Sequence, residues 1–87
     1  MGHVIVCGLG QVGYHVSKLL IRLGETVTVI AQEARAEFLL DVTDLGGKVI
    51  IGDARDRSVL IESGILEAKA LISVISADLT NIEVALD

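Results

Sequence analysis

The sequence predicts an α/β fold built on a parallel sheet with helices on both of its faces. Short, apolar, β-branched runs alternate with amphipathic stretches along the 87 residues, and this alternation requires right-handed crossovers between parallel strands. A glycine-rich turn with the pattern GxGxxG, at residues 8–13, follows the first strand-like run. Together these observations indicate a Rossmann-like sheet with the strand order 3-2-1-4.

The first half of the chain is predicted to contain two strands and two helices. Residues 3–7 form a short, continuous and β-branched run that is typical of a buried strand, and residues 26–30 form a second one. Between them, residues 11–23 carry an apolar stripe at helical spacing and stop at Gly24. A second helix is predicted over residues 34–45, before a pair of glycines.

The second half continues the alternation. Residues 49–51 and 70–75 are predicted to be the third and fourth strands, and residues 57–63 a short helix between them. A fourth helix is expected from about Leu79 to the end of the chain, with Asp78 as its N-cap.

The composition narrows the class of protein. A hydrophobic content of 52% and a mean hydropathy of +0.67 indicate apolar surface that a missing segment or a partner covers. We therefore expect residues 1–87 to form one domain that is C-terminally incomplete. No apolar run reaches the length of about 18 residues that a membrane span needs, and no export signal is present. The net charge of −5 argues against nucleic-acid binding, and the single Cys7 fits a reducing compartment.

The glycine-rich turn is the first candidate binding element. Gly8 allows a tight turn, Gly10 allows a pyrophosphate to approach the backbone, and Gly13 allows the helix to lie close to the strand. The N–H groups at the start of the helix, around Gln11 and Val12, favour an anion. The alternative is a strand-to-helix turn that binds nothing.

The end of the second strand departs from the dinucleotide-binding pattern. An acidic residue is expected there to take the ribose hydroxyls, and Ala31 occupies that position. Gln32 could hydrogen-bond a ribose, and Glu33 carries a carboxylate two residues later; both could equally be ordinary solvated loop residues. Arg35 could meet a 2′-phosphate or lie on the surface as the start of a helix.

The loop after the third strand lies at the same predicted sheet edge. Gly52, Asp53 and Ala54 follow the third strand, where Asp53 could accept a hydrogen bond from an adenine amino group or orient the loop. Asp53 or Asp56 could also cap the next helix, and the two roles do not exclude each other.

The end of the fourth strand is also polar. Ser76 and Asp78 could hydrogen-bond a phosphate or a ribose. His3 and His15 have no metal-ligand spacing, and no catalytic arrangement can be assembled, so we expect neither a metal site nor catalytic residues.

The order of these motifs is similar to that of a known family. The motifs together resemble the TrkA-N (RCK, regulator of potassium conductance) nucleotide-binding family. They are the runs at residues 4–13 and 52–56, followed by Leu60 and by residues 64–65, 68–70 and 78–81. The likeness covers nearly all of the chain. By resemblance, the glycine loop would hold phosphates, Asp53 and Ala54 would approach the adenine, and Asp78 would border the pocket, while Ala31 replaces the acid that the family usually carries.

The resemblance implies a cytoplasmic regulatory domain at the inner face of the cell membrane. Such domains bind NAD(H), ATP, ADP or a cation, self-associate as dimers or larger assemblies, and control a membrane-embedded channel or transporter subunit for potassium or another cation. Two alternatives remain: the cofactor-binding half of an NAD(P)-dependent oxidoreductase, for which the chain supplies no proton-transfer residue, and a degenerate module that only mediates assembly.

Overall fold

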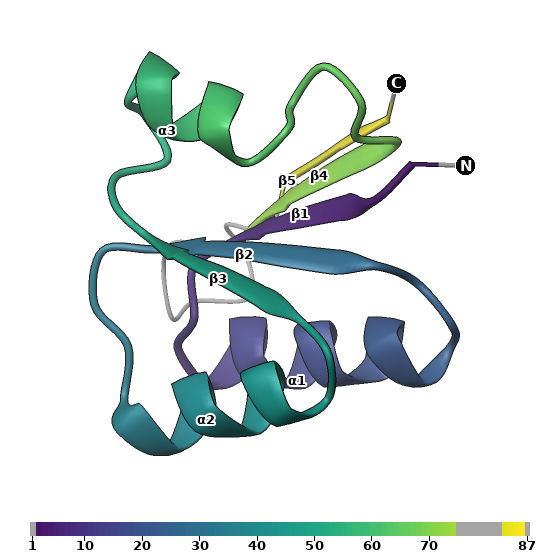
Figure 1. Cartoon of the computed structure of the whole chain (residues 1–87), viewed down its shortest axis with the longest axis vertical. Helices are drawn as coiled ribbons and strands as arrows, with labels where there is room; N and C mark the ends of the chain where they lie inside the picture. The colour runs from purple at the N-terminus through teal and green to yellow at the C-terminus, as the bar shows by residue number, and fades with distance from the viewer. Residues whose placement is uncertain (1, 75–82, 87) are drawn as a thin grey trace.

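A five-stranded sheet in the order β3-β2-β1-β4-β5 organises the computed structural model, which describes residues 2–74 and the strand at 83–86 (Figure 1). β1 (Val4–Cys7) lies at the centre and pairs in parallel with β2 (Val27–Ala31) and β4 (Ala70–Ser73). β3 (Lys48–Ile51) pairs in parallel with β2. The predicted parallel order 3-2-1-4 is therefore confirmed.

Helices cover both faces of the sheet, as predicted. α1 (Gln11–Arg22) and α2 (Ala36–Asp44) lie side by side on one face, and the shorter α3 (Arg57–Glu62) lies on the other (Figure 1). In the part of the chain that is described, no helix is both long and apolar enough to cross a membrane.

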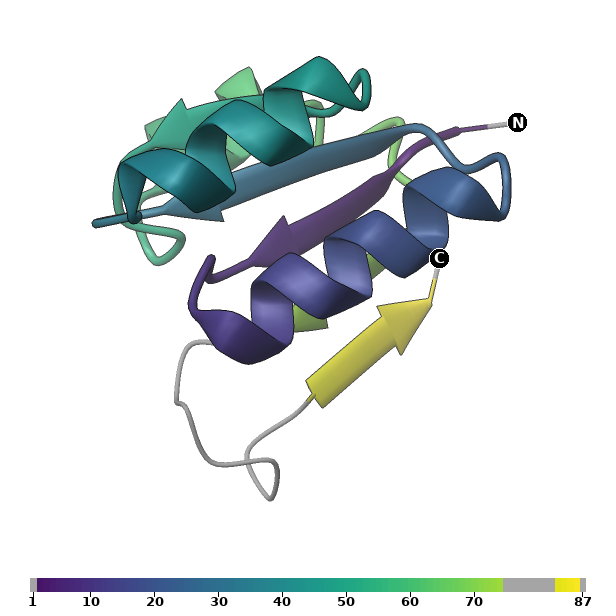
Figure 2. The same cartoon turned by 90° about the horizontal axis from the view of Figure 1, so that it is seen from below.

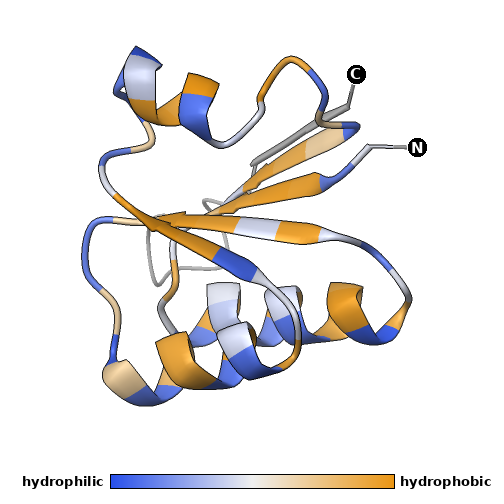
Figure 3. Ribbon diagram, viewed as in Figure 1, coloured by the Kyte–Doolittle hydropathy of each residue, from blue (hydrophilic) through white to orange (hydrophobic). Residues whose placement is uncertain are grey.

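The hydrophobic core consists of one layer on each face of the sheet. Every residue of β1 and β2 is buried, and successive side chains of a strand point to opposite faces. Figure 3 shows these strands as a largely hydrophobic band between the helices. The layer against α1 and α2 contains Val4, Val6, Val27, Val29, Ala31 and Val42. The layer against α3 contains Ile5, Cys7, Ile30 and Ala68.

The end of the chain differs from the prediction. The prediction of a helix that runs to the end of the chain is wrong for residues 83–86. These residues form β5 (Glu83–Leu86), antiparallel to β4 (Figure 2). Its predicted start at Asp78 and Leu79 lies outside the described residues. The physical reason is that an edge strand exposes unpaired N–H and C=O groups, which a further strand satisfies. A helix of a few residues gains no comparable tertiary hydrogen bonding.

Two glycines determine the geometry of the connection from β1 to α1. Gly8 has φ of 109°, a left-handed conformation that favours glycine. A Cβ on Gly13 would overlap with the carbonyl oxygen of Gly8 and lie 2.9 Å from its carbonyl carbon. The turn and the close approach that the sequence predicted for these residues are both present, and they bring the start of α1 to the carboxyl edge of the sheet.

We expect Gly13→Ala to destabilise the protein by about 1–3 kcal/mol or more, because the added methyl group forces the helix away from the strand. The free energy of unfolding from urea denaturation measures this. Gly10→Ala is the matched control: a Cβ at Gly10 meets nothing within 4 Å, so its effect should stay within about 1 kcal/mol. Equal losses in the two variants would contradict the packing argument.

Candidate functional site

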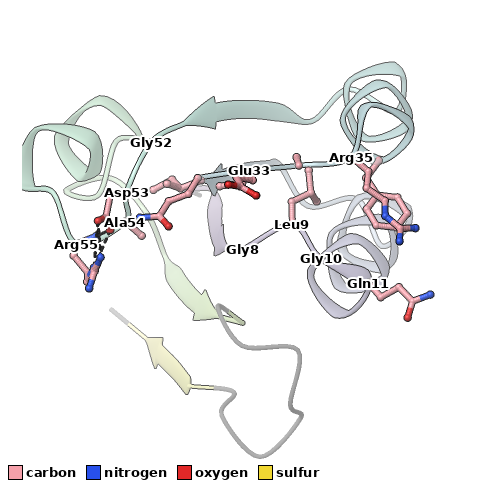
Figure 4. Close-up of a pocket in the computed structure, with 15 residues that line it drawn as sticks. Gly8, Leu9, Gly10, Gln11, Glu33, Arg35, Gly52, Asp53, Ala54 and Arg55 are labelled. Atoms are coloured by element: carbon pink, nitrogen blue, oxygen red, sulfur yellow. Dashed lines mark hydrogen bonds and ion pairs between the residues drawn. The ribbon is translucent and has the colours of Figure 1, made fainter.

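A cleft of about 930 Å³ opens at the carboxyl edge of the sheet, where β1, β2 and β3 end (Figure 4). Two backbone hydrogen bonds tie its loops to β2: Gly8 N–H donates to Ile30 O at 2.7 Å, and Gly52 N–H donates to Ala31 O at 2.8 Å. The end of β2 is therefore held between the two loops. The cleft is lined by residues 8–11, 30–35, Phe38 and residues 52–55.

The start of α1 forms one wall and offers N–H groups to an anion. Gly10 is the N-cap residue, with no side-chain hydrogen bond to the helix, and the first turn has no acidic residue. The first N–H groups of a helix have no intrahelical partner and lie at the positive end of the helix dipole. A Cβ on Gly10 would meet nothing within 4 Å, and its φ of −85° is open to any residue. The packing of the chain itself therefore does not require glycine at this position.

The opposite end of the cleft contains an ion pair between Asp53 and Arg55. Arg55 Nη2 lies 2.9 Å from Asp53 Oδ2, Arg55 Nε lies 3.1 Å from Oδ1, and the backbone N–H of Arg55 donates to Oδ1 at 2.9 Å. These hydrogen bonds lower the pKa of Asp53 to about 2. The hydrogen bond of the guanidinium contributes most, and one from Gln32 contributes less. Asp53 is thus an ionised hydrogen-bond acceptor at neutral pH.

The structure decides which aspartate caps α3. Asp56 is the N-cap residue, and its Oδ1 accepts hydrogen bonds from the backbone N–H of Ser58 at 3.0 Å and from the Ser58 hydroxyl at 2.9 Å. Asp53 Oδ1 instead accepts its backbone hydrogen bond from Arg55, in the loop before the helix, and the side chain lines the cleft. The predicted cap is therefore confirmed for Asp56 and wrong for Asp53, whose hydrogen bond from the Arg55 N–H orients the loop.

Arg35 and Phe38 form a side of the cleft; the sequence left Arg35 open as a contact of a 2′-phosphate and did not include Phe38 among the site residues. The Arg35 guanidinium lies 5.6 Å from the centre of the Phe38 ring, and that ring stacks on Tyr14 with 4.3 Å between centres. Arg55 was also absent from the predicted set. Its position two residues after Asp53, in a loop at a strand end, was the available signal.

Most of the predicted binding residues come together in this cleft, although contact of each with a ligand stays a prediction. Val12 and Gly13 lie within α1, behind the lining residues. Ser76 and Asp78 lie outside the described residues. The predicted residues that line the cleft are Gly8, Gly10, Gln11, Gln32, Glu33, Gly52, Asp53 and Ala54.

The surroundings of His3 and Cys7 indicate that both residues have structural roles. His3 Nε2 lies 2.7 Å from the carbonyl oxygen of Ser63, which joins the start of β1 to the end of α3. Cys7 is buried in the layer against α3, and burial raises the pKa of its thiol. A buried thiol with a raised pKa is a poor nucleophile.

Comparison with known proteins gives two matches. The model of the TrkA-N domain family matches residues 4–87. The Trk system potassium uptake protein TrkA of Streptomyces coelicolor is 35% identical over 80 residues, which cover 92% of this chain and 35% of that protein. The chain therefore spans about a third of the length of this curated relative. The similarity is to a potassium uptake protein and not to an enzyme family.

We expect Arg55→Ala to raise the pKa of Asp53 from about 2 toward its ordinary value of 3.8. The rise should be incomplete, because the backbone N–H of residue 55 still donates to the carboxylate. An NMR pH titration of the Asp53 carboxyl carbon measures it. Since the folded-state pKa lies below the unfolded one, stabilisation by this pair is present above pH 3.8 and is lost as the pH falls toward 2.

Arg57→Ala is the matched control for this titration. It removes the same charge two residues farther along the chain, from an exposed position in α3. The pKa of Asp53 should stay at about 2 in this variant. An unchanged pKa in Arg55→Ala would show that the guanidinium is not its cause.

Proposed function

Because this chain belongs to the TrkA-N domain family, we propose that it is a nucleotide-binding regulatory domain that controls the transport of potassium or another cation. One observation carries this proposal. The uncapped start of α1 faces a cleft at the carboxyl edge of the sheet, where the absence of a side chain at Gly10 leaves open space. Ligands of open parallel α/β sheets bind at this edge.

The proposed ligand is NAD(H), ATP or ADP. Its phosphates lie against the backbone of Gly8 and Gly10, where the start of α1 stabilises negative charge. Its adenine lies toward Asp53 and Ala54 at the far end of the cleft. The ionised Asp53 carboxylate suits this role because it accepts hydrogen bonds from an exocyclic amino group. Gln32 lines the cleft beside Asp53 and would contact the ribose.

Regulation would proceed through the assembly of several such domains. A nucleotide shifts an assembly only by binding one arrangement more tightly than another. Large apolar side chains are available for association, since Leu23, Leu40 and Leu66 are 69%, 61% and 83% exposed. In this proposal the domain lies in the cytoplasm at the inner face of the membrane and acts on a membrane-embedded potassium channel or transporter. The potassium uptake function named for the TrkA relative supports that partner.

A module that only mediates assembly is the second candidate, and Ala31 favours it. This residue leaves the end of β2 without the carboxylate that usually holds a ribose. The two candidates differ in whether any nucleotide binds.

We expect at least one of NADH, NADPH, ATP and ADP to raise the melting temperature of the purified protein by several degrees. A ligand at 100 times its dissociation constant adds about 2.7 kcal/mol to stability. Sedimentation velocity with and without that nucleotide then tests whether the assembly changes.

Gly10→Ala should weaken nucleotide binding about tenfold, because its methyl group occupies the space of the phosphates.

Lys48→Ala is the control for the binding measurement, since Lys48 lies at the amino end of β3, away from the cleft. Its affinity should equal that of the unmodified protein. If none of the four nucleotides binds and a dimer persists in solution, the assembly-only function replaces the proposed one.

A further inference from the structure

We propose that the cleft prefers a nucleotide whose adenosine ribose carries a 2′-phosphate, and so binds NADP(H) more tightly than NAD(H). This inference rests on the proposed function and specifies its ligand. Two features of the cleft carry it: the residue at the end of β2 and the arginine at the start of α2.

The end of β2 lacks the group that selects an unphosphorylated ribose. A carboxylate at this position accepts a hydrogen bond from the ribose 2′-hydroxyl and repels a 2′-phosphate. Ala31 lines the cleft there and is only 3% exposed. Its methyl group provides neither the acceptor nor the repulsion.

Arg35 is the cation available for the phosphate. Its guanidinium lies over the ring of Phe38, and the Phe38 ring stacks on Tyr14, whose hydroxyl donates to Asp41. This contact holds the guanidinium against the side of the cleft. A guanidinium binds a phosphate through two parallel hydrogen bonds, which gives such pairs both strength and geometric selectivity.

The charge of Arg35 is only weakly neutralised within the described part of the chain. Its nearest carboxylate oxygen is that of Glu37 at 3.5 Å, and both side chains are 69% exposed. Exposed pairs of this kind contribute little and exchange readily for a stronger anion. Arg55, the other cleft arginine, instead makes a close two-point contact with Asp53.

The position of Arg35 also fits the order of groups in a dinucleotide. Figure 4 shows Arg35 on the side of the cleft next to α1, with Asp53 and Arg55 at the opposite end. In the proposed orientation the ribose lies over Ala31 at the end of β2, so that its 2′-position faces the loop of residues 32–35 that carries Arg35. Glu33 also lines the cleft, but it is exposed on the loop after β2, where solvent and salt screen its charge.

The test compares the dissociation constants of NADPH and NADH for the purified protein by calorimetry. NADPH should bind at least about tenfold more tightly, the difference expected for one charge-assisted contact with a phosphate. Arg35→Gln should weaken NADPH binding about tenfold and change NADH binding less than about twofold. Ala31→Asp should reverse the preference. Arg57→Gln, an exposed arginine outside the cleft, is the matched control and should change neither affinity.

Each other outcome has a defined meaning. Equal or tighter binding of NADH overturns the preference for a 2′-phosphate, while nucleotide binding itself stands. Equal losses of both ligands in Arg35→Gln also overturn it, because Arg35 would then contact a part that the two share. If Ala31→Asp does not fold, the exposed Arg35→Gln still decides. Failure of NADH, NADPH, ATP and ADP alike would refute the proposed function itself.

Discussion

The close approach of Gly13 to Gly8 is the constraint on which the cleft depends. A side chain at residue 13 would overlap with the Gly8 carbonyl, so the absence of a Cβ allows α1 to begin directly behind the end of β1. The left-handed conformation of Gly8 supplies the turn between them. As a result, the first N–H groups of the helix open onto the sheet edge. A longer connection would separate the positive end of the helix dipole from the strand ends.

The end of β2 links this wall to the rest of the cleft. Its last carbonyl groups accept hydrogen bonds from Gly8 and Gly52, so the loops after β1 and β3 are fixed relative to the same two residues, Ile30 and Ala31. Charge is distributed unevenly across the resulting space. The Asp53–Arg55 pair is internally neutralised at one end, whereas the start of α1 and Arg35 offer positive charge at the other. Glu33 is the cleft's exposed carboxylate on the loop after β2, and the remaining asymmetry is what the proposed function uses to orient an anionic ligand with a neutral aromatic end.

The sequence predicted those features that depend on local pattern. Buried strands, amphipathic helices and the two structural glycines follow from short-range periodicity and backbone sterics, and the parallel order follows from connection length. What it missed depends on contacts between distant segments. β5 forms because β4 offers an open edge, which no window around residues 83–86 reveals. The sequence left open whether Arg35 lies at the site, and it did not reveal Phe38, whose ring contacts Arg35 and stacks on Tyr14 of another helix.

The fold requires two of the three glycines of the loop and does not require the third. Gly8 and Gly13 are required by the fold, through a positive φ and a close contact, and a module that only mediates assembly would need both. Gly10 meets neither requirement, since its φ is ordinary and a Cβ there would be unobstructed. Serine or aspartate at this N-cap would stabilise α1 by a few tenths of a kcal/mol more, at about the level known for such caps. A side chain at this point would also occupy the approach to the helix N–H groups, and an aspartate would neutralise their field. The open backbone at Gly10 therefore suits the anion of the proposed function, and the contacts of the fold do not by themselves require glycine there.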